Sequence, residues 1–122
     1  MTKSIRLLAL SFTLAAFACD DGGEDAEPDH ARTQGVLDLQ GDTAAGATVF
    51  MMICGTSACH GADGNTPGTA DTKKLSEEIP GRDDRNIVNV ILKGEGPMPP
   101  QEAILNDQQI ADVLAYVRDT FG

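Results

Sequence analysis

The sequence has very little aromatic material from which to build a core. Its 122 residues include no tryptophan, one tyrosine and four phenylalanines. A domain of this size buries a small fraction of its surface and often depends on a disulfide, a metal ion or a cofactor. Because loops rich in glycine and proline also interrupt the chain, we expect something other than side chains to fill the middle of the fold.

Alternating apolar and polar residues, the pattern of a half-buried strand, are also missing. From Gly41 onward the apolar residues recur at helical spacing instead. The spacing predicts three helices, which run from Asp42 or Thr43 towards Cys54, from Asp84 to Lys93, and from a cap at Asn106 to Phe121. Asn106 and Gln109 have the spacing of a capping box. The sequence therefore predicts an all-α domain over residues 41–122.

Basic residues are scarce, since nine lysines and arginines face 19 acidic residues and give a net charge of −10. This balance disfavours nucleic acid and anionic membrane surfaces as partners. It favours protein partners that dock through a basic face. Four cations could still form a local basic patch that the total charge conceals: Lys73, Lys74, Arg82 and Arg85.

The longest apolar run, Leu7 to Phe17, is about half of the roughly 20 residues that a membrane-spanning helix needs. It follows Lys3 and Arg6 and ends in Ala16-Phe17-Ala18, which supplies the small residues of a signal-peptidase site. Residues 1–18 are therefore predicted to be a signal peptide. We expect export to the periplasm and no transmembrane anchor.

Cys19 is the odd one of three cysteines, and an odd cysteine in an exported chain needs an explanation. Its place after Ala18 resembles the lipid-modified first residue of a bacterial lipoprotein, so membrane contact is expected only through a lipid on Cys19. Ala16 departs from the lipoprotein pattern, because lipoproteins usually have leucine at this position. The alternative is ordinary cleavage after Ala18, which leaves Cys19 as a free thiol.

Residues 19–40 are predicted to be an acidic flexible tether, because the segment has almost nothing apolar before Val36. Like charges along it would extend it. His30 lies in this tether with no second ligand-type residue at useful spacing, so we expect an exposed histidine without a ligand role.

The stretch from Cys54 to His60 carries the clearest chemistry. Two thiols followed at once by an imidazole are typical of covalent haem attachment, although the common spacing is Cys-x-x-Cys-His and here four residues, Gly55 to Ala58, separate Cys54 from Cys59. The thiols would add to the haem vinyl groups and His60 would bind the iron. A disulfide between the cysteines and a zinc site are the alternatives, and zinc lacks a second pair of ligands.

A second iron ligand is predicted from the loop between the last two helices. Met98 lies in Gly94-Glu95-Gly96-Pro97-Met98-Pro99-Pro100, where prolines fix the backbone and glycines permit close approach. Met98 could equally be a core residue on its own evidence. Met51 and Met52 are expected to pack on a helix face.

These features together, over residues 41–122, resemble the small bacterial class I cytochromes c. The resemblance implies that family's fold around one covalently bound haem c, with the first and last helices crossing near Gly46, Phe50 and Tyr116. It implies thioether links at Cys54 and Cys59 and axial ligation by His60 and Met98. It also makes the Pro67 carbonyl a candidate partner for the other His60 nitrogen. A longer gap between the cysteines is similar to some sites in multihaem cytochromes of sulfate-reducing bacteria.

The first functional hypothesis is electron transfer between redox partner proteins outside the cytoplasmic membrane, by a protein that is not itself an enzyme. With both axial positions filled, no substrate would reach the iron. The alternatives are the electron-entry subunit of a haem enzyme or peroxidase and, from a different class, a haem-free binding module held by a disulfide.

Overall fold

The longest element is the C-terminal helix α5, Asp107–Phe121, in a computed structural model that describes residues 27–122. Its capping box is complete. The Asn106 side chain accepts from the Gln109 amide at 2.9 Å, and the Gln109 side chain accepts from the Asn106 amide at 3.0 Å. Both the predicted helix and its start are thereby confirmed.

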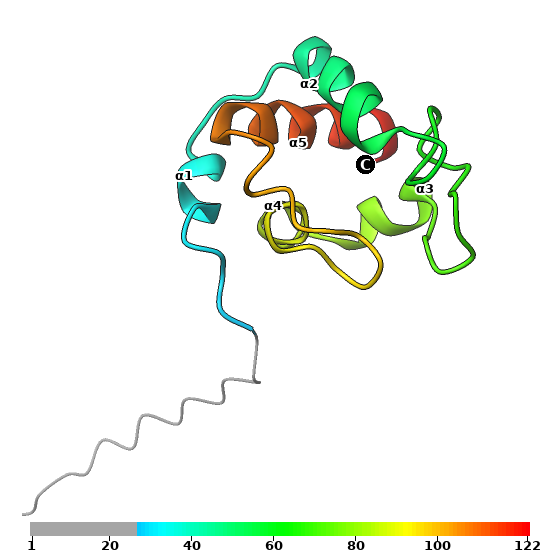
Figure 1. Ribbon diagram of the computed structural model, residues 1–122. Coiled ribbons are helices and arrows are strands. Elements are labelled where there is room, and N and C mark those ends of the chain that lie inside the picture. Colours follow the sequence, from blue (N-terminus) through cyan, green and yellow to red (C-terminus); the bar gives the residue numbers. More distant parts are fainter. Residues whose placement is uncertain (1–26) are drawn as a thin grey trace, which may run out of the picture.

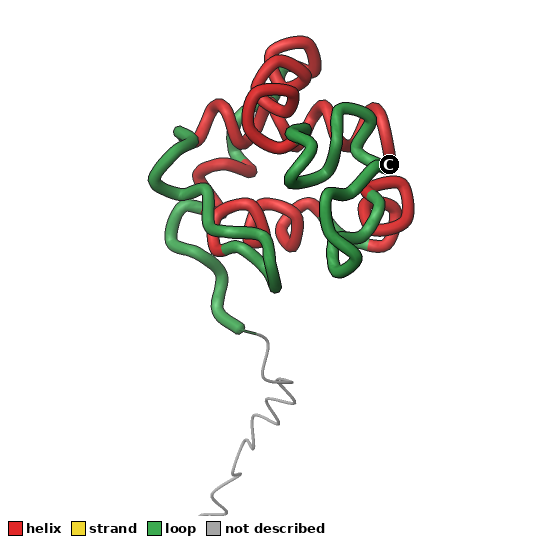
Figure 2. The backbone as a smooth tube through the Cα atoms, turned by 45° about the vertical axis from the view of Figure 1, so that its right-hand side comes forward, coloured by secondary structure: helices red, strands yellow, loops and turns green. Residues whose placement is uncertain are grey.

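The remaining elements are also helical, and residues 27–122 contain no strand. The all-α class is therefore confirmed. In chain order they are α1 (Thr33–Leu37), α2 (Thr43–Val49), the π-helix η1 (Phe50–Cys54), α3 (Leu75–Glu78), the 3-10 helix η2 (Ile79–Gly81) and α4 (Asp84–Lys93), followed by α5. Long loops connect them and cover much of the domain (Figure 2).

Helices α2 and α5 cross at close range (Figure 1). Gly46 is buried at the crossing, where a Cβ atom would overlap the Asp112 carbonyl and lie 2.9 Å from the Cβ of Tyr116. The rings of Phe50 and Tyr116 pack beside it with centroids 5.1 Å apart. The crossing implied for Gly46, Phe50 and Tyr116 is confirmed. The glycine is needed because only a residue without a side chain lets the two backbones approach this closely.

The first predicted helix is present but changes its winding. Residues 43–49 are α-helical, whereas Phe50–Cys54 form a π-helix. The amide of Gly55 donates to the carbonyl of Phe50, five residues earlier, at 2.6 Å, as the wider turn requires. Such turns are frequent at functional sites, and this one ends on Cys54.

Helix α4 lies on the other side of the domain from α2 (Figure 1) and follows the prediction closely. Asp83 caps its start by accepting from the Asn86 amide at 2.7 Å. Its buried residues are the predicted Ile87, Val88, Ile91 and Leu92. Gly94 ends it at a positive φ of 77°, a conformation that favours glycine.

The predicted tether is wrong over residues 27–40. This segment forms α1 and packs against α4 and α5, with Thr33 and Val36 0% exposed. His30 is half-buried, and its Nε2 lies 2.7 Å from a Glu102 carboxylate oxygen, so it is not the free surface histidine that was expected. Two well-placed buried residues and a set of polar contacts outweigh the acidic composition. The signal peptide, Cys19 and the start of the tether lie outside the described residues.

One of these polar contacts predicts a dependence of stability on pH. The Asp29 carboxylate accepts from Asn89 and from Arg85, both at 2.6 Å, and these hydrogen bonds lower the pKa of Asp29 below 3.8. A lowered folded-state pKa contributes stability above pH 3.8 that is lost as the pH falls through the folded value. We expect Asp29→Asn to be less stable than the parent at neutral pH.

The same difference should vanish in strong acid, because the parent carboxyl is then protonated. Denaturant titrations of both proteins from neutral pH to below pH 3.8 measure it. A difference that stays constant across this range would contradict the assignment.

Candidate functional site

One cavity of about 340 Å³ lies between the helices, within the size range of ligand pockets. Its lining includes all four of the predicted haem residues, Cys54, Cys59, His60 and Met98. They come from η1, from the turn after it and from the loop between α4 and α5. The structure thus brings together side chains that are up to 44 residues apart in the sequence.

Apolar side chains form most of the remaining wall. They belong to η1, α4 and α5 and include Phe50, Ile53, Ile87, Ile91, Val113 and Val117. A flat, largely apolar group fits such walls, whereas a small polar ligand would leave them wet. The cavity occupies the middle of the domain, where the shortage of aromatic residues left room.

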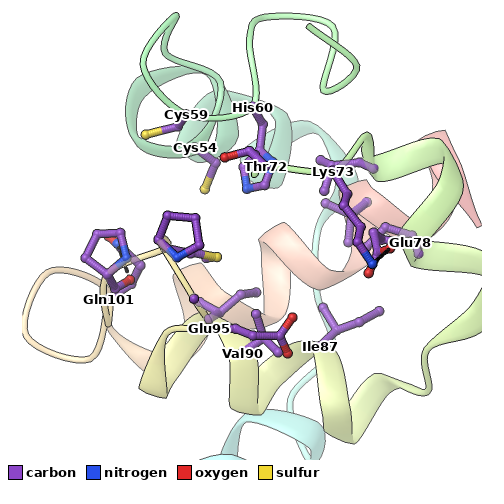
Figure 3. Close-up of a pocket in the computed structure, with 18 of the residues that line it drawn as sticks. Cys54, Cys59, His60, Thr72, Lys73, Glu78, Ile87, Val90, Glu95 and Gln101 are labelled. Atoms are coloured by element: carbon purple, nitrogen blue, oxygen red, sulfur yellow. Dashed lines mark hydrogen bonds and ion pairs between the residues drawn. The ribbon is translucent and has the colours of Figure 1, made fainter. Parts of the chain in front are cut away.

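The two cysteines lie on the same side of the cavity and are free thiols. Cys54 is buried, and its sulfur points into the cavity, whereas half-buried Cys59 lies beside it nearer the surface (Figure 3). Burial, with a smaller contribution from Cys59, raises the pKa of the Cys54 thiol to about 11. The Cys54 thiol is therefore neutral near neutral pH.

The four residues between the cysteines form a compact turn at the surface. The carbonyl of Thr56 accepts from the amides of Cys59 and Gly61, each at 3.0 Å, and the amide of His60 donates to the carbonyl of Cys54 at 3.1 Å. Thr56, Ser57 and Ala58 are exposed. Thr56, Ser57 and Ala58 thus loop outward, and Cys54, Cys59 and His60 still line the same cavity.

His60 directs its imidazole into the cavity (Figure 3). Burial lowers the pKa of His60, which favours the neutral form that binds metals. Its Nδ1 is buried and has no hydrogen-bond partner. The hydrogen bond proposed to the Pro67 carbonyl is therefore wrong. The His60 imidazole is half-buried at the wall of an apolar cavity and has no protein partner. These features fit an imidazole that binds the metal of a group held in the cavity.

Met98 lines the cavity from the loop between α4 and α5, which is held in a tight turn. Glu95 and Met98 exchange backbone hydrogen bonds of 3.1 and 3.0 Å. Gly94 and Gly96 on either side of Glu95 have φ values of 77° and 55°. Met98 is half-buried and packs against the core as well as lining the cavity.

A charged cluster that sequence reasoning missed borders the cavity. The Arg82 guanidinium lies 2.9 Å from Glu78 and 2.6 Å from Glu95, and the Lys73 ammonium lies 3.2 Å from Glu78. Hydrogen bonds from Arg82 lower the pKa of both carboxylates. The only signal in the sequence is the four-residue spacing of Glu78 and Arg82, which is common on helix surfaces.

The four cations that could form a local basic patch, Lys73, Lys74, Arg82 and Arg85, are neutralised by neighbouring carboxylates. Besides Lys73 and Arg82, Lys74 lies 3.8 Å from Glu77 and Arg85 lies 2.6 Å from Asp29. Each cation is thus paired with a carboxylate. The surface keeps the acidic character that the composition indicates.

Met51 and Met52 are 49% and 69% exposed, so the prediction that they pack on a helix face is wrong. Phe50 and Cys54 are the buried residues of η1, and the two methionines between them face outward. As for a zinc site, residues 27–122 contain no cluster of three or more histidine, cysteine, aspartate or glutamate side chains able to hold a metal ion.

This chain belongs to a family of c-type cytochromes, which are electron-transfer proteins. Residues 41–117 match the family described as cytochrome c oxidase, cbb3-type, subunit III. The match covers α2, most of α5, the two cysteines with His60, and the Met98 loop. Membership identifies the cofactor as covalently bound haem c, and the cavity described above fits it.

Among curated proteins the chain is similar to cytochromes c6. It is 36% identical over 85 residues to cytochrome c6 of Limnospira maxima. This alignment covers 65% of this chain and 93% of that protein. It is also 36% identical over 80 residues to cytochrome c6 of Parathermosynechococcus lividus, covering 64% of this chain and 90% of that protein. The identity is modest, but nearly the whole of each relative is matched.

Proposed function

We propose that this protein is an exported one-electron carrier with a single haem, attached through Cys54 and Cys59 and ligated by His60 and Met98. The observation that carries the proposal is the convergence of these four side chains on one apolar cavity. When bound, the haem supplies an iron that accepts one electron from a donor protein and passes it to an acceptor.

The cysteines would hold the group permanently. When haem is bound, Cys54 and Cys59 would each hold it through a carbon–sulfur bond to one of its two vinyl groups. The exposed turn at Thr56, Ser57 and Ala58 supports two such links, because both cysteines remain in the lining of the cavity.

His60 and Met98 both line the cavity, one from the turn after η1 and the other from the loop between α4 and α5, and would be the two protein ligands of the haem iron. A site closed in this way leaves no place for a substrate, which supports a carrier rather than an enzyme. Methionine ligation raises the reduction potential. The similarity to cytochromes c6 supports the same conclusion.

Replacing Met98 tests the ligation directly. We expect Met98→Ala to retain covalent haem, to bind added imidazole far more tightly than the parent, and to lose the red charge-transfer band by which ferric haem reports a methionine sulfur. Spectra of the ferric protein during an imidazole titration measure both effects. An unchanged spectrum and imidazole affinity would show that Met98 is a packing residue. An electron carrier would then need a different second ligand for its haem iron.

For location, we propose export to the periplasm, directed by residues 1–18, with a lipid anchor at Cys19. No helix within residues 27–122 is long and apolar enough to cross a membrane. Detergent-dependent release from membranes, abolished by Cys19→Ala, is the expected result for a lipid anchor.

Partners with a basic docking face suit the acidic surface. A partner that binds more weakly as the salt concentration rises would support docking through a basic face.

A second candidate role is the electron-entry subunit of a larger haem enzyme. It is favoured by the family description, which names a subunit of a cytochrome c oxidase. Copurification of the tagged protein from its native membranes distinguishes the two roles. A stoichiometric complex with oxidase activity supports the subunit, whereas a free protein reduced and oxidised by separate partners supports the carrier.

A further inference from the structure

Residues 27–38, here called the N-terminal strap, lie outside the family match, which begins at residue 41. They are nevertheless part of the fold. Helix α1 contacts both α4 and α5, and Thr33 and Val36 are 0% exposed. Nothing in the family resemblance explains why this segment should be held so firmly.

One end of the strap is fixed to α4, the helix that leads into the Met98 loop. The Asn89 amide oxygen accepts from the Thr33 hydroxyl at 2.7 Å and from the His30 backbone amide at 2.8 Å. Asp29 accepts from Arg85 and Asn89. Lys93, the last residue of α4, donates to the Pro28 carbonyl at 3.2 Å.

Its centre is fixed to the segment that leads out of the Met98 loop and into α5. The Arg32 guanidinium donates to the carbonyls of Glu102 and Leu105 at 2.6 and 2.8 Å and to the Asp107 carboxylate at 2.6 Å. His30 adds the contact to Glu102. In Figure 1, α1 lies beside the start of α5 and close to the chain that arrives from the Met98 loop.

The loop between these two anchor points has few supports of its own. Apart from the turn at Glu95 and Met98, two polar contacts hold it: the Glu95 carboxylate lies 2.6 Å from the Arg82 guanidinium, and the Gln101 amide donates to the Ile91 carbonyl at 2.9 Å. The strap therefore sets the spacing between the end of α4 and the start of α5. That spacing decides how far Met98 reaches into the cavity.

We propose that the N-terminal strap positions the Met98 loop, with Arg32 as the principal positioning residue. The inference rests on the proposed ligation by Met98. Arg32 does not line the cavity, so it acts only by holding the two carbonyls and the carboxylate that follow the loop. Hydrogen bonds to a charged group are stronger than those between neutral groups, and those of Arg32 resist any outward movement of the loop.

Removing Arg32 should thus make Met98 easier to displace. In holoprotein carrying covalent haem, we expect Arg32→Gln to raise the affinity of ferric haem for added imidazole by about tenfold, the change that corresponds to one such hydrogen bond. Visible spectra during the titration report the exchange of ligands. Circular dichroism during denaturation reports the free energy of unfolding of the same samples.

Arg118 offers a matched control. Its guanidinium also binds one carboxylate, Asp84 at 2.6 Å, and two carbonyls, those of Ile79 and Arg82, but away from the segment that follows Met98. Arg118→Gln should lose comparable stability and leave the imidazole affinity within about twofold of the parent. Equal imidazole affinities for the two variants would overturn the proposal, since the effect would then be general loosening.

Two further results keep the test decisive. Arg32→Lys, which retains the charge but not the fork of donors, should fold and give an intermediate imidazole affinity. An Arg32→Lys protein identical to the parent would also overturn the proposal. If the parent itself binds imidazole as tightly as Met98→Ala, then ligation by Met98 fails, and the proposed function is wrong before the strap is considered.

Discussion

A His60→Ala variant, made in cells that attach haem to proteins, is expected to contain little or no covalent haem. His60 is the only histidine that lines the cavity, and its buried Nδ1 has no partner within the protein. No other imidazole is placed to take over. Without an axial ligand beside the two thiols, the haem would lose the contact that orients it for attachment. The haem-to-protein ratio of purified material measures the loss.

His30→Ala is the matched control for this experiment. His30 contacts Glu102 outside the cavity, and we expect the variant to retain a full complement of covalent haem. Full haem content in His60→Ala would remove His60 from the proposed site. Loss of haem in both variants would show that folding, and not ligation, limits attachment.

Gly46→Ala is expected to destabilise the holoprotein by at least about 2 kcal/mol. Alanine is otherwise the better helix former by about 1 kcal/mol, so the sign of this change is diagnostic. The new methyl group would overlap the Asp112 carbonyl and press on Tyr116, and both are parts of α5 that cannot move independently. The crossing would open and separate the paired rings of Phe50 and Tyr116.

Denaturant titration of the purified holoprotein provides the measurement, and Gly81→Ala provides the control. No atom lies within 4 Å of the position that a Cβ at Gly81 would take. We expect that variant to remain within about 0.5 kcal/mol of the parent. A Gly46→Ala protein as stable as Gly81→Ala would mean that α2 and α5 do not cross as described.

The sequence predicted those helices that contain their own capping residues and apolar spacing. Helix α5 has a capping box and a sustained apolar stripe, and α4 has a capping aspartate, four buried residues at helical spacing and a terminal glycine. The α2–α5 crossing required more than spacing. It followed from a family resemblance that gave Gly46 and Tyr116 a common place, which a single helix pattern cannot do.

The N-terminal strap was missed because its stabilisation is almost entirely non-local. Arg32 binds atoms 70 to 75 positions away along the chain. Within the segment itself, only Thr33 and Val36 are buried, and acidic residues dominate the composition around them. A short window therefore resembles a solvated tether, although the folded domain provides partners for nearly every polar group.

The candidate site was predictable where chemistry restricts the residue types. Cys54, Cys59 and His60 stand out because few other reasons place two thiols and an imidazole so close together, and Met98 stands out by its glycine and proline neighbours. The charged cluster around Arg82 was not predictable, because Glu95 reaches it from a different loop. The orientation of His60 relative to Pro67 likewise depends on a loop without a periodic pattern.

The most direct test of the central claim is the intact mass of protein produced with a haem-attachment system, combined with the pyridine haemochrome spectrum. We expect the mass of the chain from Cys19 onward plus one haem, with the lipid on Cys19 counted separately, and a spectrum with two thioether links, in spite of the four residues between Cys54 and Cys59. A colourless protein at the mass of the bare chain, or a spectrum that shows a single thioether, would contradict the central claim.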